Sequence, residues 1–151
     1  MAKEAPLTPE QEKLWRALMR IVIVMPRMLD RDLVRATGLT ATEYLTLVNL
    51  SEAPRRELRM ADLAAATGLS PSRTTRLVDD LQTRGLAQKR PSDSDGRGFV
   101  AKLTAEGLAK LKSAWPAHLA SVHRRAFDHV DDATLVDAAE AVARIAGALD
   151  C

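Results

Sequence analysis

The chain has 151 residues, of which 46% are hydrophobic and 28% charged, with a formal net charge of +2 and a single cysteine, Cys151. This length and composition predict one folded domain with a sizeable core and exclude a disordered chain, while the lone cysteine excludes a disulfide framework or a cysteine zinc cluster. The dense apolar run from Ile21 to Leu29 is far shorter than the roughly 20 residues of a membrane span. The N-terminal residues carry no secretory signal, so we expect a cytoplasmic protein without a membrane partner.

The charge is distributed unevenly along the chain. Residues 55–102 carry 10 Lys and Arg against 6 Asp and Glu, whereas the flanks carry 12 against 14. A basic middle between mildly acidic ends predicts a central module that faces a polyanion and flanks that have another role.

Two helices are expected before the basic segment. The first begins at the TPEQ segment of residues 8–11, where Thr is the N-cap, Pro takes the first helical position and Gln completes a capping box. Apolar residues at three- and four-residue spacing carry this helix to about Thr37, and Gly38 ends it. A second capping box, TATE at residues 40–43, opens a helix through Leu50.

A helix-turn-helix and a hairpin follow. Residues 61–67 form a compact helix closed by Gly68, and a second short helix covers residues 71–84 after the N-cap Ser70. Helices separated by Gly-Leu-Ser have the spacing of a helix-turn-helix. Beyond it, two extended runs flank the polar loop SDSDGRG at residues 92–98, which predicts a β-hairpin.

The second helix of this motif has the features of a DNA-recognition helix. A buried stripe is predicted on one side at Thr74, Leu77, Val78 and Leu81. The exposed side is small and basic at its amino end, where Ser72, Arg73, Thr75 and Arg76 follow Ser70. Backbone N–H groups and the positive end of the helix dipole favour phosphate there, and an arginine can bind guanine O6 and N7 together. The alternative is a solvated amphipathic helix.

The predicted hairpin is basic as well. Lys89, Arg90 and Arg97 are expected on or near its tip, and further arginines precede the helix-turn-helix at positions 55, 56 and 59. A basic hairpin directly after such a motif predicts a wing that contacts the DNA backbone or minor groove. Asp95 is expected to fold back on Arg97 or on loop amides and so fix the tip, with an ordinary acidic turn as the alternative.

Two helices are expected after the hairpin. Thr104 caps a long helix through Phe127, and Asp131 caps a last helix that reaches Leu149. The apolar stripes of the terminal helices are longer than a small winged core can cover, so a second copy is expected to bury them. A two-fold homodimer would place its recognition helices roughly 34 Å apart on DNA. The predicted fold is therefore mainly α, a winged helix-turn-helix with dimerisation helices at both ends.

These segments resemble the MarR family of transcriptional regulators. The matching stretches are GLTATEYLTLVNLSEAP, LRMADLAAATGLSPSRTTRLVDDLQTRGLAQKR, SDSDGRGFVAKLTAEG and DDATLVDAAEAVARIAG, which together cover roughly residues 8 to 149. The resemblance implies a homodimer with a helical dimerisation region at 8–37 and 105–149 and a DNA-binding lobe at 40–104. It also implies a palindromic operator, usually repression, and release by a small, often phenolic, effector or by an oxidant.

Carried over by position, the resemblance implies that residues 70–76 lie in the major groove and that Arg97 heads the wing contact. The sequence departs from the family pattern at two positions. Thr74 replaces the usual aliphatic residue, which predicts slightly loose packing of the helix. Gly98 replaces a frequent second basic residue, which predicts a weaker hold of the wing on the backbone.

Four amphipathic side chains are candidates for an effector pocket: Trp15, Tyr44, Trp115 and His118. In the family fold they would lie near the junction of dimer helices and DNA-binding lobe, and the alternative is that they only pack this hinge.

Other chemistry finds little support in the sequence. His118, His123 and His129 are spaced five and six residues apart, so they do not share one helix face as metal ligands would. Cys151 has no sequence neighbour that would lower its pKa. No catalytic constellation or phosphate loop is present, and we expect neither an enzyme nor a cofactor. The rival function is a winged-helix module for protein–protein assembly, with arginines that only solubilise it.

Overall fold

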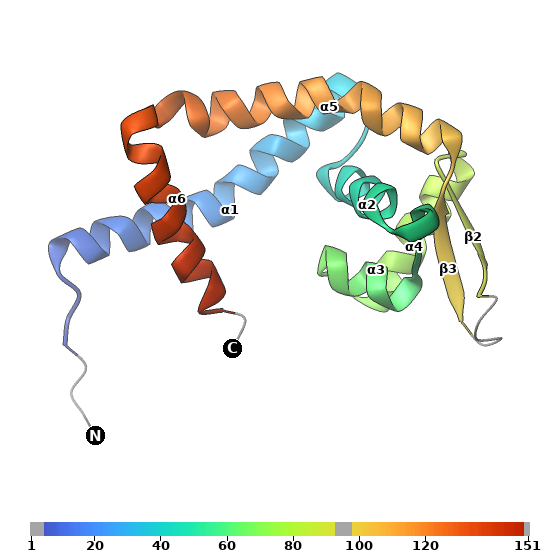
Figure 1. Ribbon diagram of the computed structural model, residues 1–151, viewed down its shortest axis with the longest axis horizontal. Coiled ribbons are helices and arrows are strands. Elements are labelled where there is room, and N and C mark those ends of the chain that lie inside the picture. The colour runs from blue at the N-terminus through green and yellow to red at the C-terminus, as the bar shows by residue number, and fades with distance from the viewer. Residues whose placement is uncertain (1–4, 93–97, 150–151) are drawn as a thin grey trace. The chain divides into compact units, whose positions relative to one another are not determined.

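The computed structural model describes residues 5–92 and 98–149. The chain divides into two compact units, residues 1–118 and residues 119–151. The first unit contains the winged helix-turn-helix, as predicted, and the elements α1 to β3 together with the first part of α5 (Figure 1).

The first two helices form where the capping signals predict them. Helix α1 spans Pro9–Thr37 and helix α2 spans Ala41–Glu52, and both capping boxes are complete. Gly38 ends α1 with a φ of 71°, a left-handed conformation that glycine adopts without a Cβ penalty, and its N–H donates to the Val34 carbonyl at 2.9 Å. Helix α2 runs two residues beyond the predicted Leu50.

The helix-turn-helix consists of α3 (Met60–Thr67) and α4 (Pro71–Thr83). Thr74, Val78 and Leu81 of α4 are buried, as the predicted stripe requires, and Leu77 is half-buried. The Thr74 hydroxyl donates to the Ser70 carbonyl at 3.1 Å, so this buried polar group is satisfied inside its own helix.

Three antiparallel strands form one small sheet in the order β1-β3-β2: β1 (Glu57–Arg59), β2 (Ala87–Pro91) and β3 (Phe99–Leu103). The hairpin of β2 and β3 is confirmed. Residues 57–59, directly before α3, pair with β3 as a third strand, with Glu57 opposite Lys102 and Arg59 opposite Val100. A 3₁₀ turn, Pro54–Arg56, leads into β1.

The core of the first unit lies between α2, α3, α4, the sheet and the adjoining parts of α1 and α5. Its fully buried large side chains are Leu33, Leu39, Leu47, Leu50, Leu63, Val78 and Leu81. The buried face of α4 therefore packs against the core, and the opposite face of that helix is exposed.

The start of α5 (Ala105–Arg125) packs closely on the turn between α4 and β2. The Thr104 hydroxyl accepts a hydrogen bond from the Gly107 N–H at 2.9 Å and donates to the Gly85 carbonyl at 2.7 Å. A Cβ added at Gly107 would lie 2.0 Å from the Leu86 carbonyl oxygen, so only glycine fits at this position. The α-helix ends at Arg125, and Phe127 opens a short 3₁₀ turn, Phe127–His129, instead of continuing the helix.

The second unit holds the end of α5 and helix α6 (Asp132–Gly147), which the Asp131 side chain caps by accepting from the Thr134 N–H at 2.9 Å. Large apolar side chains of α6 are exposed: Leu135, Val136, Val142 and Ile145. Within the first unit α1 exposes a similar set: Leu14, Trp15, Met19, Ile21, Val22, Ile23 and Val24. Across the described parts of the chain, no helix is both long and apolar enough to cross a membrane.

Candidate nucleic-acid interface

The amino end of α4 is an exposed polar surface. Ser72, Arg73, Thr75 and Arg76 are all exposed, whereas Thr74 between them is buried. Ser70 caps the helix by accepting from the Arg73 N–H at 3.4 Å, and its hydroxyl lies 3.3 Å from that of Ser72. The cap thus fixes the first turn while its side chains remain accessible.

The two arginines of this turn have no side-chain partner among the residues that the structure describes. Within the described part of the chain, neither Arg73 nor Arg76 forms an ion pair or side-chain hydrogen bond, and both line an open hollow with Leu69 and Asp80. Since a guanidinium carries five donors, each can still bind an acceptor-rich partner in a bidentate manner.

The backbone of the same turn offers fewer donors than the sequence suggested. Pro71 has no N–H, the Arg73 N–H bonds the Ser70 side chain, and the Thr74 N–H bonds the Ser70 carbonyl at 2.9 Å. Among the described residues, the Ser72 N–H is therefore the donor of this turn left for a partner.

Lys89 and Arg90 differ from the two α4 arginines. Lys89 lies opposite Ala101 in the ladder of the hairpin, and its ammonium forms an ion pair with Asp79 of α4. Its backbone N–H also donates to Gln82 Oε1 at 2.7 Å. These contacts tie strand β2 to the exposed face of α4.

Arg90 is held by the first strand. Its guanidinium lies 2.9 Å from Glu57, which also pairs with Arg55 at 2.9 Å. The hydrogen bond from Arg90 lowers the pKa of the Glu57 carboxyl, and the positive charges of Arg55 and Lys102 act in the same direction against desolvation. Lys89 and Arg90, two of the three predicted wing cations, therefore have carboxylate partners in Asp79 and Glu57. Arg97 and Asp95 lie outside the described residues.

Three of the four amphipathic candidates come together at the α2–α5 contact. The Tyr44 and His118 rings are 4.6 Å apart between centroids, and Trp115 and His118 are 6.1 Å apart. Trp15 is 56% exposed and takes part in none of the ring contacts of the described residues. The aromatic group is therefore Tyr44, Trp115 and His118.

This aromatic group contains two polar atoms that are buried without a hydrogen-bond partner among the described residues, the Tyr44 hydroxyl and His118 Nδ1. Burial lowers the pKa of His118 and raises the pKa of Tyr44, so both side chains are held in their neutral forms. An unsatisfied buried polar atom is costly, and this group contains two of them on neighbouring rings.

No group of three or more His, Cys, Asp or Glu among the described residues could hold a metal ion, and Cys151 lies outside those residues.

The comparisons with known proteins agree with one another. A sequence model of the MarR family matches residues 37–98. A MarR family transcriptional regulator from Streptomyces coelicolor, solved in complex with DNA, is 31% identical, with a TM-score of 0.87 over 100% of this chain and 94% of that one. This chain belongs to the MarR family.

Two further members extend the comparison. CouR from Rhodococcus jostii, solved bound to p-coumaroyl-CoA, is 28% identical with a TM-score of 0.71, covering 89% of this chain and 92% of that one. The transcriptional repressor MprA of Escherichia coli is 28% identical over 92 residues, which are 61% of this chain. The match spans about half (52%) of the length of that curated relative. In this MarR family chain, residue pattern alone did not reveal the ion pairs of Asp79 and Glu57.

Proposed function

We propose that this chain is a sequence-specific, double-stranded DNA-binding transcriptional regulator that acts as a homodimer on a palindromic operator, as a repressor. The observation that carries the proposal is the amino end of α4, where Arg73 and Arg76 are exposed and lack ion-pair partners among the described residues. The DNA complex of the Streptomyces regulator and the repressor activity named for MprA support it.

In this proposal the first turns of α4 enter the major groove. Arg73 and Arg76 contact base edges, while Ser70, Ser72 and Thr75 permit close approach to the duplex. Arg97 contacts the backbone, with Asp95 fixing the tip of the wing. Lys89 and Arg90 contribute through the positive potential of a hairpin that their ion pairs hold in place.

Dimerisation is assigned to residues 8–37 and 105–149, and DNA binding to residues 40–104. The support for this division is the exposed apolar surface of α1 and α6, where several large side chains are half or more exposed. A second copy would bury it and set two α4 helices side by side for a two-fold operator.

A small effector, phenolic in class, would bind at the aromatic group and release the DNA. The unsatisfied Tyr44 hydroxyl and His118 Nδ1 are groups that a ligand hydroxyl or carboxylate could satisfy, with Trp115 beside them. CouR, which was solved with p-coumaroyl-CoA, supports a ligand of this chemical class. Trp15 would join such a site only if its exposed side chain reached it in the dimer.

We further propose that the chain acts without catalysis or a cofactor and in the cytoplasm, as a transcriptional regulator would. The rival function is a winged-helix protein–protein assembly module. The arginines of α4 distinguish the two, because a module of that kind has no need of unpaired guanidinium groups at the amino end of α4.

Selection of bound fragments from random duplex DNA, followed by a salt titration on the selected sequence, tests the proposal. We expect an enriched palindrome and a loss of affinity of about 10³-fold or more between 50 and 200 mM salt, as for 6 to 10 phosphate contacts. Binding without enrichment, or affinity that hardly changes with salt, would favour the assembly module.

A further inference from the structure

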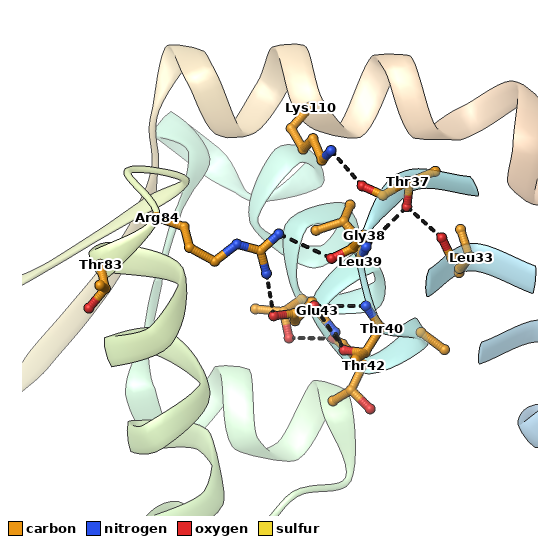
Figure 2. Close-up of polar contacts among 12 residues, drawn as sticks. Leu33, Thr37, Gly38, Leu39, Thr40, Thr42, Glu43, Thr83, Arg84 and Lys110 are labelled. Atoms are coloured by element: carbon orange, nitrogen blue, oxygen red, sulfur yellow. Dashed lines mark hydrogen bonds and ion pairs between the residues drawn. The ribbon is translucent and has the colours of Figure 1, made fainter. Parts of the chain in front are cut away.

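The carboxyl end of α4 is held by hydrogen bonds to other helices, in contrast to the exposed side chains at its amino end. Arg84, the C-cap residue of α4, donates from Nη1 to Glu43 Oε1 at 2.7 Å and from Nη2 to the Gly38 carbonyl at 3.2 Å. Both partners are distant in sequence, on the junction between α1 and α2. Figure 2 shows the Arg84 guanidinium between these two acceptors.

Glu43 has two structural roles at this junction. Its Oε2 accepts from the Thr40 N–H at 2.7 Å and so completes the capping box of α2, while Oε1 accepts from Arg84. The Glu43 side chain is 12% exposed and that of Arg84 38%, so the pair is only partly screened by water. One carboxylate thereby joins the start of α2 to the end of α4.

The same junction is also held by α5. Lys110 donates from Nζ to the Thr37 carbonyl at 2.6 Å, and Thr37 donates from its hydroxyl to the Leu33 carbonyl at 2.8 Å (Figure 2). The carbonyls of Thr37 and Gly38 end α1 without partners in their own helix, and they carry the negative end of its dipole. Two cations from different helices therefore satisfy the end of α1.

We propose that Arg84 is a positioning residue for operator recognition, which fixes the orientation of α4 relative to α1. This inference rests on the proposed function. Arg84 and Ser72 lie twelve residues apart on α4, about 18 Å along the helix, so Arg84 does not share the proposed base contacts. A tilt of about 5° at the Arg84 end moves the other end by about 1.5 Å, more than a hydrogen bond tolerates.

The consequence concerns the distance between the two half-sites. In the proposed homodimer, α1 belongs to the dimerisation region, so a clamp between α4 and α1 sets how far apart the two α4 helices lie. One inserted base pair shifts a half-site by about 3.4 Å and turns it by about 34°. A rigid clamp makes the protein intolerant of that change, and a loosened one relaxes the requirement.

The variants are chosen to leave the fold intact. Arg84→Met keeps the length of the side chain but removes both donors, while Thr74, Val78 and Leu81 still anchor α4 in the core. Glu43→Gln keeps a carbonyl oxygen that can accept from the Thr40 N–H. It replaces the negative carboxylate that pairs with Arg84 by a neutral amide. Arg35→Met is the matched control, because Arg35 is an exposed cation in the last turn of α1 that does not bond the Thr37 or Gly38 carbonyl.

The test measures affinity for the selected operator, for the same operator with one base pair added or removed between half-sites, and for random duplex. We expect Arg84→Met and Glu43→Gln to lower operator affinity by about threefold to thirtyfold and to leave random-duplex affinity nearly unchanged. The penalty for the altered spacing should fall in both variants and stay at the wild-type value in Arg35→Met. Arg84→Lys keeps the charge but has only one donor nitrogen. Its operator affinity should therefore lie between those of wild type and Arg84→Met.

Two results would overturn the inference, and a third would overturn the proposed function. Equal losses on operator and random DNA, with a shallower salt dependence, would make Arg84 a direct phosphate contact. Spacing penalties that match wild type in Glu43→Gln would remove the clamp, even if Arg84→Met unfolded by circular dichroism. A wild-type protein with no sequence preference would instead overturn the proposed function itself, and this result is distinct because it appears before any variant is made.

Discussion

In the winged lobe Leu47, Leu63 and Leu81 are fully buried, whereas on the terminal helices Val22 and Val136 expose 66% and 64% of their surface. The lobe completes its core within one chain, because three short helices and a sheet cover one another's apolar faces. Helices α1 and α6 have apolar stripes without such cover. The difference teaches that folding of the lobe and assembly of the chain depend on different residues and can be separated by substitution.

The largest effect is expected at the junction between α5 and the lobe. Gly107→Ala places a methyl group against the Leu86 carbonyl, a backbone atom that cannot turn away, so we expect a loss of about 3 kcal/mol or more in the free energy of unfolding. Urea denaturation followed by circular dichroism measures it. Gly147→Ala is the matched control, since nothing lies within 4 Å of its added Cβ, and it should be neutral or slightly stabilising. A stable Gly107→Ala protein would contradict the close approach.

The next effect separates assembly from folding. Val22→Asp or Val136→Asp places a charge in the proposed dimer interface, and we expect the dimer dissociation constant to rise by about thirtyfold or more. Analytical ultracentrifugation measures it, and the circular dichroism spectrum should be retained. Leu45→Asp is the control, because Leu45 is exposed on α2 of the lobe. If all three variants associate equally well, α1 and α6 are not the interface.

Within the lobe, substitutions of the α4 arginines and of the wing arginine should affect DNA binding in different ways. Arg73→Ala or Arg76→Ala should cost about 1–3 kcal/mol on the operator and relax base preference, with thermal stability unchanged because neither side chain has a partner in the described lobe. Arg97→Ala should weaken binding to all sequences alike and reduce the salt dependence. Fluorescence anisotropy with operator and random duplexes measures both. Uniform losses from the α4 variants would make Arg73 and Arg76 phosphate contacts.

The smallest effect is a dependence of the stability of the first unit on pH. Burial lowers the pKa of His118 in the folded chain, so the unfolded chain binds a proton more readily, near its ordinary value of 6.5. The stabilisation is therefore present above that pH and is lost as the pH falls below it. Melting temperatures at pH 7.5 and 5.5 should differ more for wild type than for His118→Phe. His123→Phe, at an exposed position, should behave like wild type.

Local features of this fold were predictable because their causes are local. The caps at Thr8, Thr40, Ser70 and Asp131 lie where the residue pattern placed them, since each needs only a side-chain oxygen and an N–H three residues ahead. The exposed face of α4 follows in the same way from a helical period of 3.6 residues.

The non-local features were not predictable. Strand β1 has only three residues, too few for a period-two pattern, and it exists because β3 offers it a partner. The ion pairs of Lys89 and Arg90 depend on carboxylates ten and thirty-three residues away in the sequence. The sequence pattern therefore indicated a basic hairpin, although two of its positive charges are paired with carboxylates. Trp15 is aromatic like members of this group, but it lies on α1 and takes part in none of their ring contacts, which composition alone does not reveal.

The ion pair between Lys89 and Asp79 joins the hairpin to α4 across two elements. Together with the hydrogen bond from the Lys89 N–H to Gln82, it fixes strand β2 against helix α4. The orientation of the hairpin relative to α4 is therefore set before DNA binds. Less conformational entropy is lost on binding than if the two elements moved independently.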